Sequence, residues 1–272
     1  MKLSVVIITY NEEANIGRTL QSVTPLIAER RGEIIIVDSG STDRTVEIAK
    51  SFGAKVFIEE WKGYATQKNS AIDKATGDWI LSLDADEEVG EVAQNFILLV
   101  LSGSHDVLNQ SAGFWFLRRN YFLGRWIRHG GFYPDPKVRM FKRGSGRFEE
   151  RAVHEDVKLQ TGQAEYPASQ DGLGGRPEII HHSYPTLSDY IGHMNRYSSL
   201  GAETVVATGQ RGFSAIDIVV RPLLTFLYNY VLRRGFLDGR EGLLLHLYHA
   251  VYVSWKYSKA WELSRGQKPP GV

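Results

Sequence analysis

Short runs of aliphatic residues, each followed by polar or turn-forming residues, recur through residues 1–90. The runs occupy residues 5–8, 34–37, 56–58 and 79–83. Runs of this length without polar alternation are typical of parallel strands that are buried on both faces of a sheet. Between the first two runs, residues 13–23 carry apolar side chains at helical spacing. This alternation of strand and helix predicts a doubly wound α/β fold, with helices on both faces of a mainly parallel sheet.

Two later stretches extend the predicted sheet. Residues 113–121 and 137–141 alternate aromatic or basic residues with apolar ones. Such alternation is typical of antiparallel strands. We therefore expect a mixed sheet in which the parallel strands come first.

Polar residues gather where the predicted parallel strands end. Residues 9–12 follow the first strand, residues 38–43 follow the second, and Asp84-Ala85-Asp86 follows the fourth. Sheets of this kind bind ligands at the carboxyl ends of their strands. We therefore expect the three segments to line one crevice.

Asp84 and Asp86 stand two residues apart at a strand end, so both carboxylates point to one side. Mg²⁺ or Mn²⁺ commonly binds through one or two carboxylates together with substrate phosphates. A metal ion there would neutralise the charge that a diphosphate leaving group develops. Acidic pairs in loops are common and many bind nothing. The position after an apolar strand, with Glu87 and Glu88 alongside, favours a metal site for a nucleotide sugar.

Asp38 ends the second predicted strand and has two interpretations. Its carboxylate can accept a hydrogen bond from a base or a ribose. Alternatively, the loop only starts the next helix, with Ser41 or Asp43 as the capping residue. Both interpretations can hold together.

Histidine and arginine side chains supply further candidates. His181 and His182 follow a short apolar run, and we take His182 as a candidate metal ligand, with a purely structural role as the alternative. Arg118 and Arg139 lie on the later predicted strands, where their forked donors suit a diphosphate or an anionic acceptor. They could equally be solvated charges at a strand edge.

The end of the chain differs in charge from the rest. Residues 211–272 carry 9 basic and 4 acidic side chains, whereas residues 1–210 carry 23 and 27. A basic tail on an acidic body favours peripheral contact with an anionic membrane surface. Nucleic acid is a poor partner for this tail because most of it is apolar. Polar residues interrupt both of its long apolar stretches, so neither is a clean transmembrane span.

Residues 243–255 have the pattern of an amphipathic helix. One face carries Leu244, Leu247, Tyr248, Val251, Tyr252 and Trp255. His246 and His249 lie largely off that face, which suits a helix lying among lipid headgroups. The alternative is a helix that packs on the catalytic domain. We expect a catalytic domain over residues 1–205 and a membrane-associating helical segment over residues 206–272.

The chain has no cysteine, which excludes disulfides, thiol catalysis and cysteine-based zinc sites and fits a reducing compartment. Its first apolar run is followed by acidic residues where a signal peptide needs small ones. We interpret that run as the first strand. The expected location of the active site is therefore the cytoplasm, at the inner face of the cytoplasmic membrane.

Four segments, in order, resemble the motifs of the inverting family 2 glycosyltransferases. They are residues 5–13, 36–43, 63–69 and 83–86. The resemblance implies the GT-A fold. Val153-His154-Glu155, His182-Ser183-Tyr184 and residues 234–239 are similar to the lipopolysaccharide inner-core β-glucosyltransferases of that family. This likeness spans nearly the whole chain and implies transfer of a sugar, glucose from UDP-glucose, to a lipopolysaccharide-core or other lipid-linked saccharide.

The resemblance also implies roles for individual residues. The donor nucleotide would contact Thr9, Tyr10, Asn11, Glu12, Asp38, Ser39, Lys68, Asp84 and Ala85. Asp86 would bind Mg²⁺ or Mn²⁺ directly, with Asp84 near the ribose or the metal. An inverting transfer needs a carboxylate to take the proton of the acceptor hydroxyl. Glu155 is the first candidate for this base and Asp156 the second.

Two other classes of protein stay open from the sequence alone. A sugar-1-phosphate nucleotidyltransferase would carry a glycine-rich, arginine-containing loop after the first strand, where this chain has residues 9–13 instead. A non-catalytic, membrane-bound protein that binds nucleotide sugars is the second alternative. A Rossmann dehydrogenase is disfavoured because no G-x-G-x-x-G follows the first strand.

Overall fold

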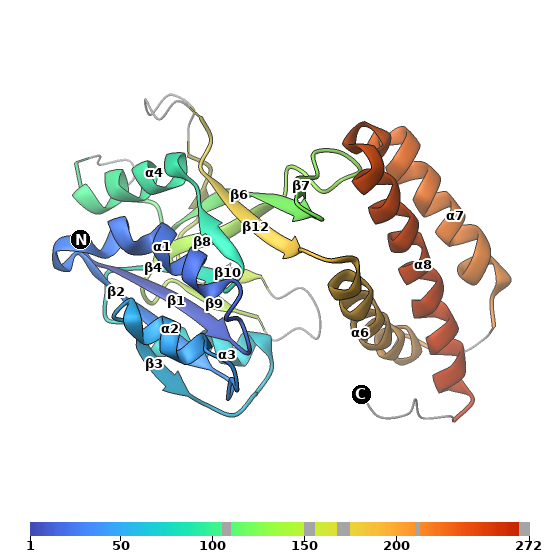
Figure 1. The fold of residues 1–272 in the computed structure, drawn as a ribbon, viewed down its shortest axis with the longest axis horizontal. Helices are drawn as coiled ribbons and strands as arrows, with labels where there is room; N and C mark the ends of the chain where they lie inside the picture. The colour runs from blue at the N-terminus through green and yellow to red at the C-terminus, as the bar shows by residue number, and fades with distance from the viewer. Residues whose placement is uncertain (105–109, 150–155, 168–174, 210–212, 267–272) are drawn as a thin grey trace. The chain divides into compact units, whose positions relative to one another are not determined.

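The chain forms two compact units in the computed structural model (Figure 1). The model describes residues 1–104, 110–149, 156–167, 175–209 and 213–266. Unit 1 comprises Met1–Arg118 and Asp135–His181, and unit 2 comprises Arg119–Pro134 and His182–Val272. Two strands, β6 (Gly113–Phe122) and β12 (Glu178–Tyr184), each contain a boundary between the units.

Unit 1 is built on a parallel set of strands in the order β3-β2-β1-β4. Their bounds are β1 Leu3–Thr9, β2 Gly32–Asp38, β3 Lys55–Ile58 and β4 Trp79–Asp84. All pairings among these strands are parallel. The strands are those predicted from the aliphatic runs, because a strand covered on both faces needs apolar residues throughout.

Antiparallel strands complete the sheet in the order β4-β8-β6-β12-β5. Strand β8 (Pro136–Lys142) pairs with β4 and β6, and β12 pairs with β5 (Glu87–Val89). The predicted antiparallel strands over residues 113–121 and 137–141 are thus confirmed. Because β5 begins directly after Asp86, its pairing with β12 brings distant parts of the sequence together.

Three further strand pairs are short. Strands β7 (Arg125–Trp126) and β11 (Ala164–Glu165) pair with β6, and β9 (Gly146–Phe148) pairs with β10 (Val157–Leu159).

Helices cover both faces of the parallel strands (Figure 1). They are α1 Ile16–Ile27, α2 Thr45–Ser51, α3 Tyr64–Asp73 and α4 Glu91–Ser102. In β1, Val5 and Ile7 belong to the core formed with α1 and α4, whereas Val6 belongs to the core formed with α3. Successive side chains of a strand point to opposite faces. The predicted fold class, a mixed and mainly parallel sheet with helices on both faces, is confirmed.

Unit 2 contains two long helices, α6 (Leu187–Ala207) and α8 (Gly239–Ser264), which pack together. A capping box between Thr186 and Asp189 starts α6. The segment between these helices is helical too. It consists of the π-helical turn η2 (Ile216–Val220), α7 (Arg221–Phe226), the π-helical turn η3 (Leu227–Leu232) and the 3₁₀ turn η4 (Gly235–Asp238).

Helix α8 is longer than the stretch 243–255 and is oriented differently from the prediction. His246, expected off the apolar face, is buried, whereas Leu247, expected on that face, is exposed. The reason is that α8 packs against α6 and α7, so its two sides are covered by neighbouring helices. No helix in the described part of the chain is both long and apolar enough to cross a bilayer.

The compact units do not coincide with the expected boundary after residue 205, since α6 belongs to the same unit as α7 and α8. The extent of the catalytic domain stays a prediction.

Candidate active site

The three segments expected to line one crevice, residues 9–12, 38–43 and 84–86, follow strands that end at one edge of the sheet. Strand pairing places Thr9 beside Asp38, and Ile8 beside Asp84. The Thr9 hydroxyl donates a hydrogen bond to Asp38 Oδ2 over 2.7 Å. Parallel strands end at a common edge, and the loops that follow them therefore form one site.

The Asp38 carboxylate organises the loop that follows β2. Its Oδ1 accepts hydrogen bonds from the backbone N–H groups of Gly40 and Ser41, at 3.0 and 2.8 Å. The Ser39 N–H donates to the carbonyl of Thr9 over 2.9 Å. Asp38 is buried, so it shapes the loop from beneath. Asp43 Oδ1 accepts from the N–H of Thr45, the first residue of α2, over 3.0 Å, although the N-cap position of this helix is Arg44 and neither Ser41 nor Asp43.

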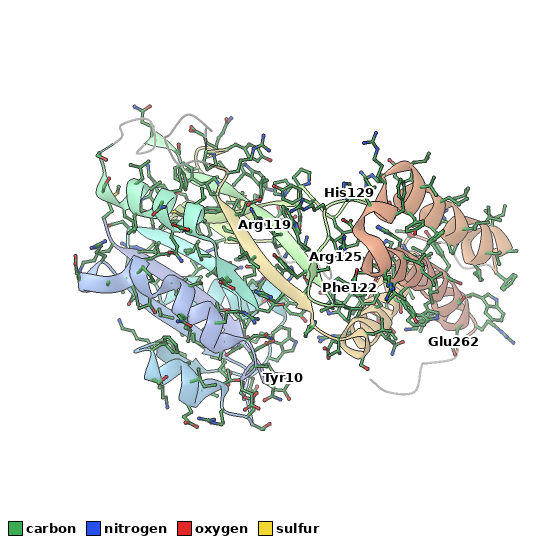
Figure 2. The ribbon with its side chains drawn as sticks, turned by 45° about the horizontal axis from the view of Figure 1, so that its top comes forward. Tyr10, Arg119, Phe122, Arg125, His129 and Glu262 are labelled. Atoms are coloured by element: carbon green, nitrogen blue, oxygen red, sulfur yellow. The ribbon has the colours of Figure 1, made fainter. Side chains whose placement is uncertain are left out.

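The loop after β1 interlocks with the loop after β2. Asn11 adopts a left-handed backbone conformation, and its side-chain oxygen accepts from the N–H of Thr42 over 2.8 Å. The Tyr10 ring is exposed and lies at the edge of unit 1 (Figure 2). Asparagine tolerates this backbone region better than most residues. The two loops thus form a continuous rim that presents Tyr10 to solvent.

Glu12 faces the acidic residues at the end of β4. Burial raises the pKa of Glu12 above its ordinary value, and the negative charges of Asp86 and Asp84 raise it further. Its carboxylate accepts a hydrogen bond from Asn15 over 2.9 Å. Carboxylates that repel one another in this way create a place where a cation is stabilised.

Asp84 is held by two cationic side chains. Lys68 Nζ lies 2.7 Å from Asp84 Oδ1, and Arg139 lies 2.8 Å from Asp84 Oδ2. Burial acts to raise the pKa of Asp84, but Lys68 and Arg139 outweigh it, so that this pKa lies well below its usual range. Since both oxygens of Asp84 contact cations, Asp86 is the better-placed metal ligand of the pair. Ala85, between them, is buried, and its carbonyl accepts from Thr19.

Glu87 also belongs to the site. From the sequence we expected it to contribute negative charge and nothing more. Its side chain has no solvent exposure. It accepts a hydrogen bond from the N–H of Asp84 over 3.0 Å, ion-pairs with Arg139, and lies 3.6 Å from Arg118. Arg118 also contacts Asp135 at 2.7 Å. Both predicted arginines therefore reach the site, and Glu87 anchors them. In the sequence, the feature that could have identified Glu87 is an acidic residue at a strand position that faces the core.

Asp86 contacts His181 and not His182. His181 Nε2 lies 3.3 Å from Asp86 Oδ2, whereas the His182 ring stacks on Tyr121. Burial acts to raise the pKa of Asp86, but the charge and hydrogen bond of His181 outweigh it and lower that pKa. Strand pairing sets His181 opposite Glu87, next to Asp86. The structure thus favours His181 over the predicted His182 as the histidine of this site.

The residues at this edge fit a divalent cation. The described residues contain no cluster of three or more side chains with metal-binding geometry. Asp86 and His181 provide a carboxylate oxygen and an imidazole nitrogen side by side. A metal that is completed by substrate phosphates needs only one or two protein ligands.

Of the two candidate bases, Asp156 lies within the described residues. Glu155 lies outside the described residues. Asp156 precedes β10, and its carboxylate contacts Lys137 Nζ at 2.9 Å with about half of the side chain (51%) exposed. The structure therefore gives Asp156 an ion pair and no contact with Asp84 or Asp86.

Residues 4–92 match the model of the family described as glycosyl transferase family 2. An uncharacterized glycosyltransferase of Rickettsia typhi is 31% identical over 97% of this chain and 88% of its own length. The chain is a family 2 glycosyltransferase. The resemblance found in the sequence is thereby confirmed, and both alternatives, a nucleotidyltransferase and a non-catalytic binding protein, are set aside.

One further relative and one solved structure are similar to this chain. The lipopolysaccharide core biosynthesis glycosyltransferase LpsC of Rhizobium meliloti (strain 1021) is 27% identical over 100% of this chain and 96% of its own. The mannosyltransferase PcManGT from Pyrobaculum calidifontis superposes with a TM-score of 0.55 at 16% identity, covering 95% of this chain and 86% of its own. This family 2 glycosyltransferase therefore has the expected GT-A fold.

Proposed function

We propose that this glycosyltransferase is metal-dependent and inverting, and that it transfers glucose from UDP-glucose to a lipopolysaccharide core or another lipid-linked saccharide. The observation that carries the proposal is the pair Asp86 and His181, 3.3 Å apart at the strand ends. Such a pair suits Mg²⁺ or Mn²⁺ with the donor diphosphate as the remaining ligand. PcManGT, which shares the fold, is described in complex with GDP-mannose and Mn²⁺, and this supports the use of a divalent metal with a nucleotide sugar here.

The residues around that pair suit a nucleoside diphosphate. The interlocked loops carrying Tyr10, Asn11 and Ser39 would hold the nucleoside, over a floor made by Thr9 and Asp38. A bound metal ion would neutralise charge on the departing diphosphate. Lys68, Arg118 and Arg139 add positive side chains at the same edge, which supports binding of an anionic leaving group without proton transfer.

The acceptor needs a base on the side of the sugar opposite the diphosphate. Glu155 would take the proton of the acceptor hydroxyl while its oxygen bonds to the anomeric carbon and the bond to the diphosphate breaks, with the electron pair leaving on UDP. Asp156 is the second candidate. Its carboxylate is engaged in an ion pair with Lys137 at 2.9 Å.

The proposed acceptor and location rest on the relative LpsC, whose name refers to lipopolysaccharide core biosynthesis. An acceptor with a lipid anchor would be met at a membrane surface. The excess of basic side chains in residues 211–272 supports peripheral contact with an anionic leaflet. We therefore propose that the enzyme works at the cytoplasmic face of the inner membrane.

The function is tested by UDP release from UDP-glucose in the presence of Mn²⁺ and an extracted core saccharide. Asp86→Asn should lower kcat/KM roughly 100-fold or more, because the variant would lose a charged ligand of the metal ion that stabilises the leaving group. Chelation of the metal should abolish release, and added Mn²⁺ should restore it. Glu155→Gln should lower kcat to a similar extent while the thermal shift on adding UDP-glucose is retained.

Glu88→Gln is the matched control. Glu88 lies two residues from Asp86, and its partly exposed carboxylate lies 3.9 Å from Arg18, so this variant should keep its activity. Undiminished release by Asp86→Asn, or release that is insensitive to chelation, would contradict the role of the metal. Faster nucleotide release from GDP-mannose than from UDP-glucose would contradict the proposed donor.

A further inference from the structure

Unit 2 exposes a continuous row of large apolar side chains along residues 216–232. The row, here called the apolar face, consists of Ile216, Val219, Val220, Leu223, Leu224, Leu227, Tyr228, Val231 and Leu232. Their exposed fractions range from 43% to 73%. Spacings of three and four residues gather most of them along one broad side of this helical segment. An exposed apolar surface of this extent marks an interaction site, because scattered exposed residues do not align in this way.

The opposite side of the same segment is fixed to the rest of unit 2. Asp217 and Pro222 are buried, and the Ser254 hydroxyl of α8 donates to the carbonyl of Ile218 over 2.8 Å. Arg221 ion-pairs with Asp217 at 2.7 Å and donates to the Tyr257 hydroxyl at 2.8 Å. The apolar face is therefore the outer side of an anchored helix, not a helix that has lost its packing partner.

A groove of about 530 Å³ runs along the apolar face. It is lined by Ile216, Val220, Arg221, Leu224, Thr225, Tyr228 and Asn229. Several of these residues stand four apart, so the groove follows the helix axis. Its lining is mostly apolar, which suits a lipid chain.

The exposed charges beside the apolar face are all of one sign. In residues 213–247 the exposed ionised side chains are Arg221, Arg233, Arg234 and Arg240. The acids of the same stretch are buried or half-buried. Asp217 and Asp238 are buried, and Glu241 lies 3.6 Å from Arg125.

A second loop of unit 2 adds arginines to this edge. Asp238 accepts hydrogen bonds from the N–H groups of Arg128 and His129, at 3.2 and 2.8 Å, and so holds that loop beside the turn after η3 (Figure 2). We call Arg125, Arg128, Arg233, Arg234 and Arg240 the arginine rim. The Arg233 guanidinium lies 5.2 Å from the ring centre of Tyr228. The rim therefore adjoins the apolar face directly.

We propose that the apolar face and the arginine rim together form the surface by which this chain lies on an anionic bilayer. Apolar side chains would enter the boundary between headgroups and acyl chains, to a depth of about 5–10 Å. The rim would bind lipid phosphates through its forked donors. A second copy of the chain is a poorer occupant, because two such rims would repel each other. This surface rests on the peripheral membrane contact of the proposed function, and it places that contact at residues 216–232 and not on α8.

The test is flotation of the full chain with vesicles of phosphatidylglycerol and phosphatidylcholine, compared with phosphatidylcholine alone. The wild-type chain should bind the anionic vesicles at least tenfold more strongly. Leu223→Ser combined with Leu227→Ser should weaken binding to them by roughly 100-fold, since two inserted side chains are lost. Arg233→Gln combined with Arg234→Gln should weaken it roughly 30-fold, and added salt should reduce this difference.

Matched controls are exposed residues of unit 1. Ile58→Ser and Arg44→Gln remove an exposed apolar and an exposed basic side chain, and both should leave vesicle binding unchanged. Far-UV circular dichroism establishes that each variant is folded. UDP release from UDP-glucose without vesicles should be normal in all four variants, so a loss of membrane binding is separable from a failure of the proposed chemistry.

Three results would overturn the proposal. One is equal binding of the wild-type chain to neutral and anionic vesicles. Another is full vesicle binding by the Leu223→Ser, Leu227→Ser variant. The third is a lipid-free dimer, seen by analytical ultracentrifugation, that this double variant converts to a monomer, because a second copy would then cover the apolar face.

Discussion

Glu87 combines complete burial with a negative charge, and such a group persists only when cations and hydrogen-bond donors surround it. Arg139 supplies the ion pair, Arg118 lies 3.6 Å away, and the N–H of Asp84 donates a hydrogen bond. Arg139 in turn reaches Asp84. Glu87 thus fixes the orientation of the arginine that holds one carboxylate of the Asp84-Ala85-Asp86 segment.

Glu87→Gln should therefore destabilise the chain strongly. The substitution keeps the size of the side chain but leaves Arg139 buried with one partner fewer, and breaking a buried pair of this kind costs about 3–5 kcal/mol. The free energy of unfolding in urea measures the effect. Glu47→Gln is the control, because Glu47 and Arg44 form an exposed pair worth at most about 1 kcal/mol. Equal losses of unfolding free energy in the two variants would show that the buried pair stabilises the chain no more than the exposed pair.

At this scale the sequence predicted which residues meet, but not how each is used. Thr9, Asp38 and Asp84 end parallel strands, and strand ends can be located from aliphatic runs. The choice between His181 and His182 depends on the register of β12 against β5. That register comes from strands almost a hundred residues apart, and no local pattern encodes it. Lys68 and Arg139 were predicted site residues, but their contacts with Asp84 join different elements, and no local pattern encodes those contacts.

Among the elements, α8 approaches η4 closely at a glycine. A Cβ atom on Gly242 would lie 2.3 Å from the carbonyl oxygen of Gly235. Because the obstacle is backbone, no side-chain rotation relieves it. The helix can therefore follow η4 at this distance only with glycine at this position.

Gly242→Ala should lower the free energy of unfolding by about 1–3 kcal/mol, the usual cost of overpacking. Gly192→Ala is the matched control. Gly192 lies inside α6 with nothing within 4 Å of the added Cβ, so alanine should stabilise that helix by up to about 1 kcal/mol. Thermal denaturation of both variants measures the difference. A stabilising effect of Gly242→Ala would contradict the close approach of α8 to η4.

Element prediction succeeded where one periodicity dominates. The parallel strands have uninterrupted aliphatic runs, and a strand buried on both faces requires them. Prediction failed for α8, because its surroundings are helices on more than one side and the hydrophobic pattern no longer marks a single buried face. The apolar side chains of residues 216–232 obey helical spacing, yet they are exposed, and a sequence pattern does not say which side of an apolar helix meets protein.

On the scale of the whole molecule, charge and exposed apolar surface are unevenly divided. The basic excess of residues 211–272 was visible in the sequence and indicated an anionic surface as partner. The covering of Asp217 and Asp238, which leaves arginine as the exposed charge, follows only from tertiary contacts. The net charge of the segment therefore understates how basic its outer surface is.

Acid stability of the whole chain provides a last prediction through His246. Its side chain is 1% exposed, and neither ring nitrogen has a hydrogen-bond partner within the described part of the protein. Burial, with a smaller contribution from His249, lowers the pKa of His246 from 6.5 to about 4, against the opposing charge of Asp238. Between these two pH values the unfolded chain holds a proton on this ring that the folded chain does not. Stability should therefore fall as the pH drops from about 6.5 to 4.

His246→Phe keeps a buried ring but cannot titrate, so it should remove up to about 3 kcal/mol of that pH-dependent loss. Urea unfolding at closely spaced pH values measures how the free energy of unfolding changes with pH. This slope can be compared between the variant and the wild-type chain even if their absolute stabilities differ. Part of the slope should persist in the variant, because burial also lowers the pKa of His249. Identical slopes would mean that His246 is protonated in the folded chain, and its buried position beside Gly130 and Gly235 would then have to open in acid.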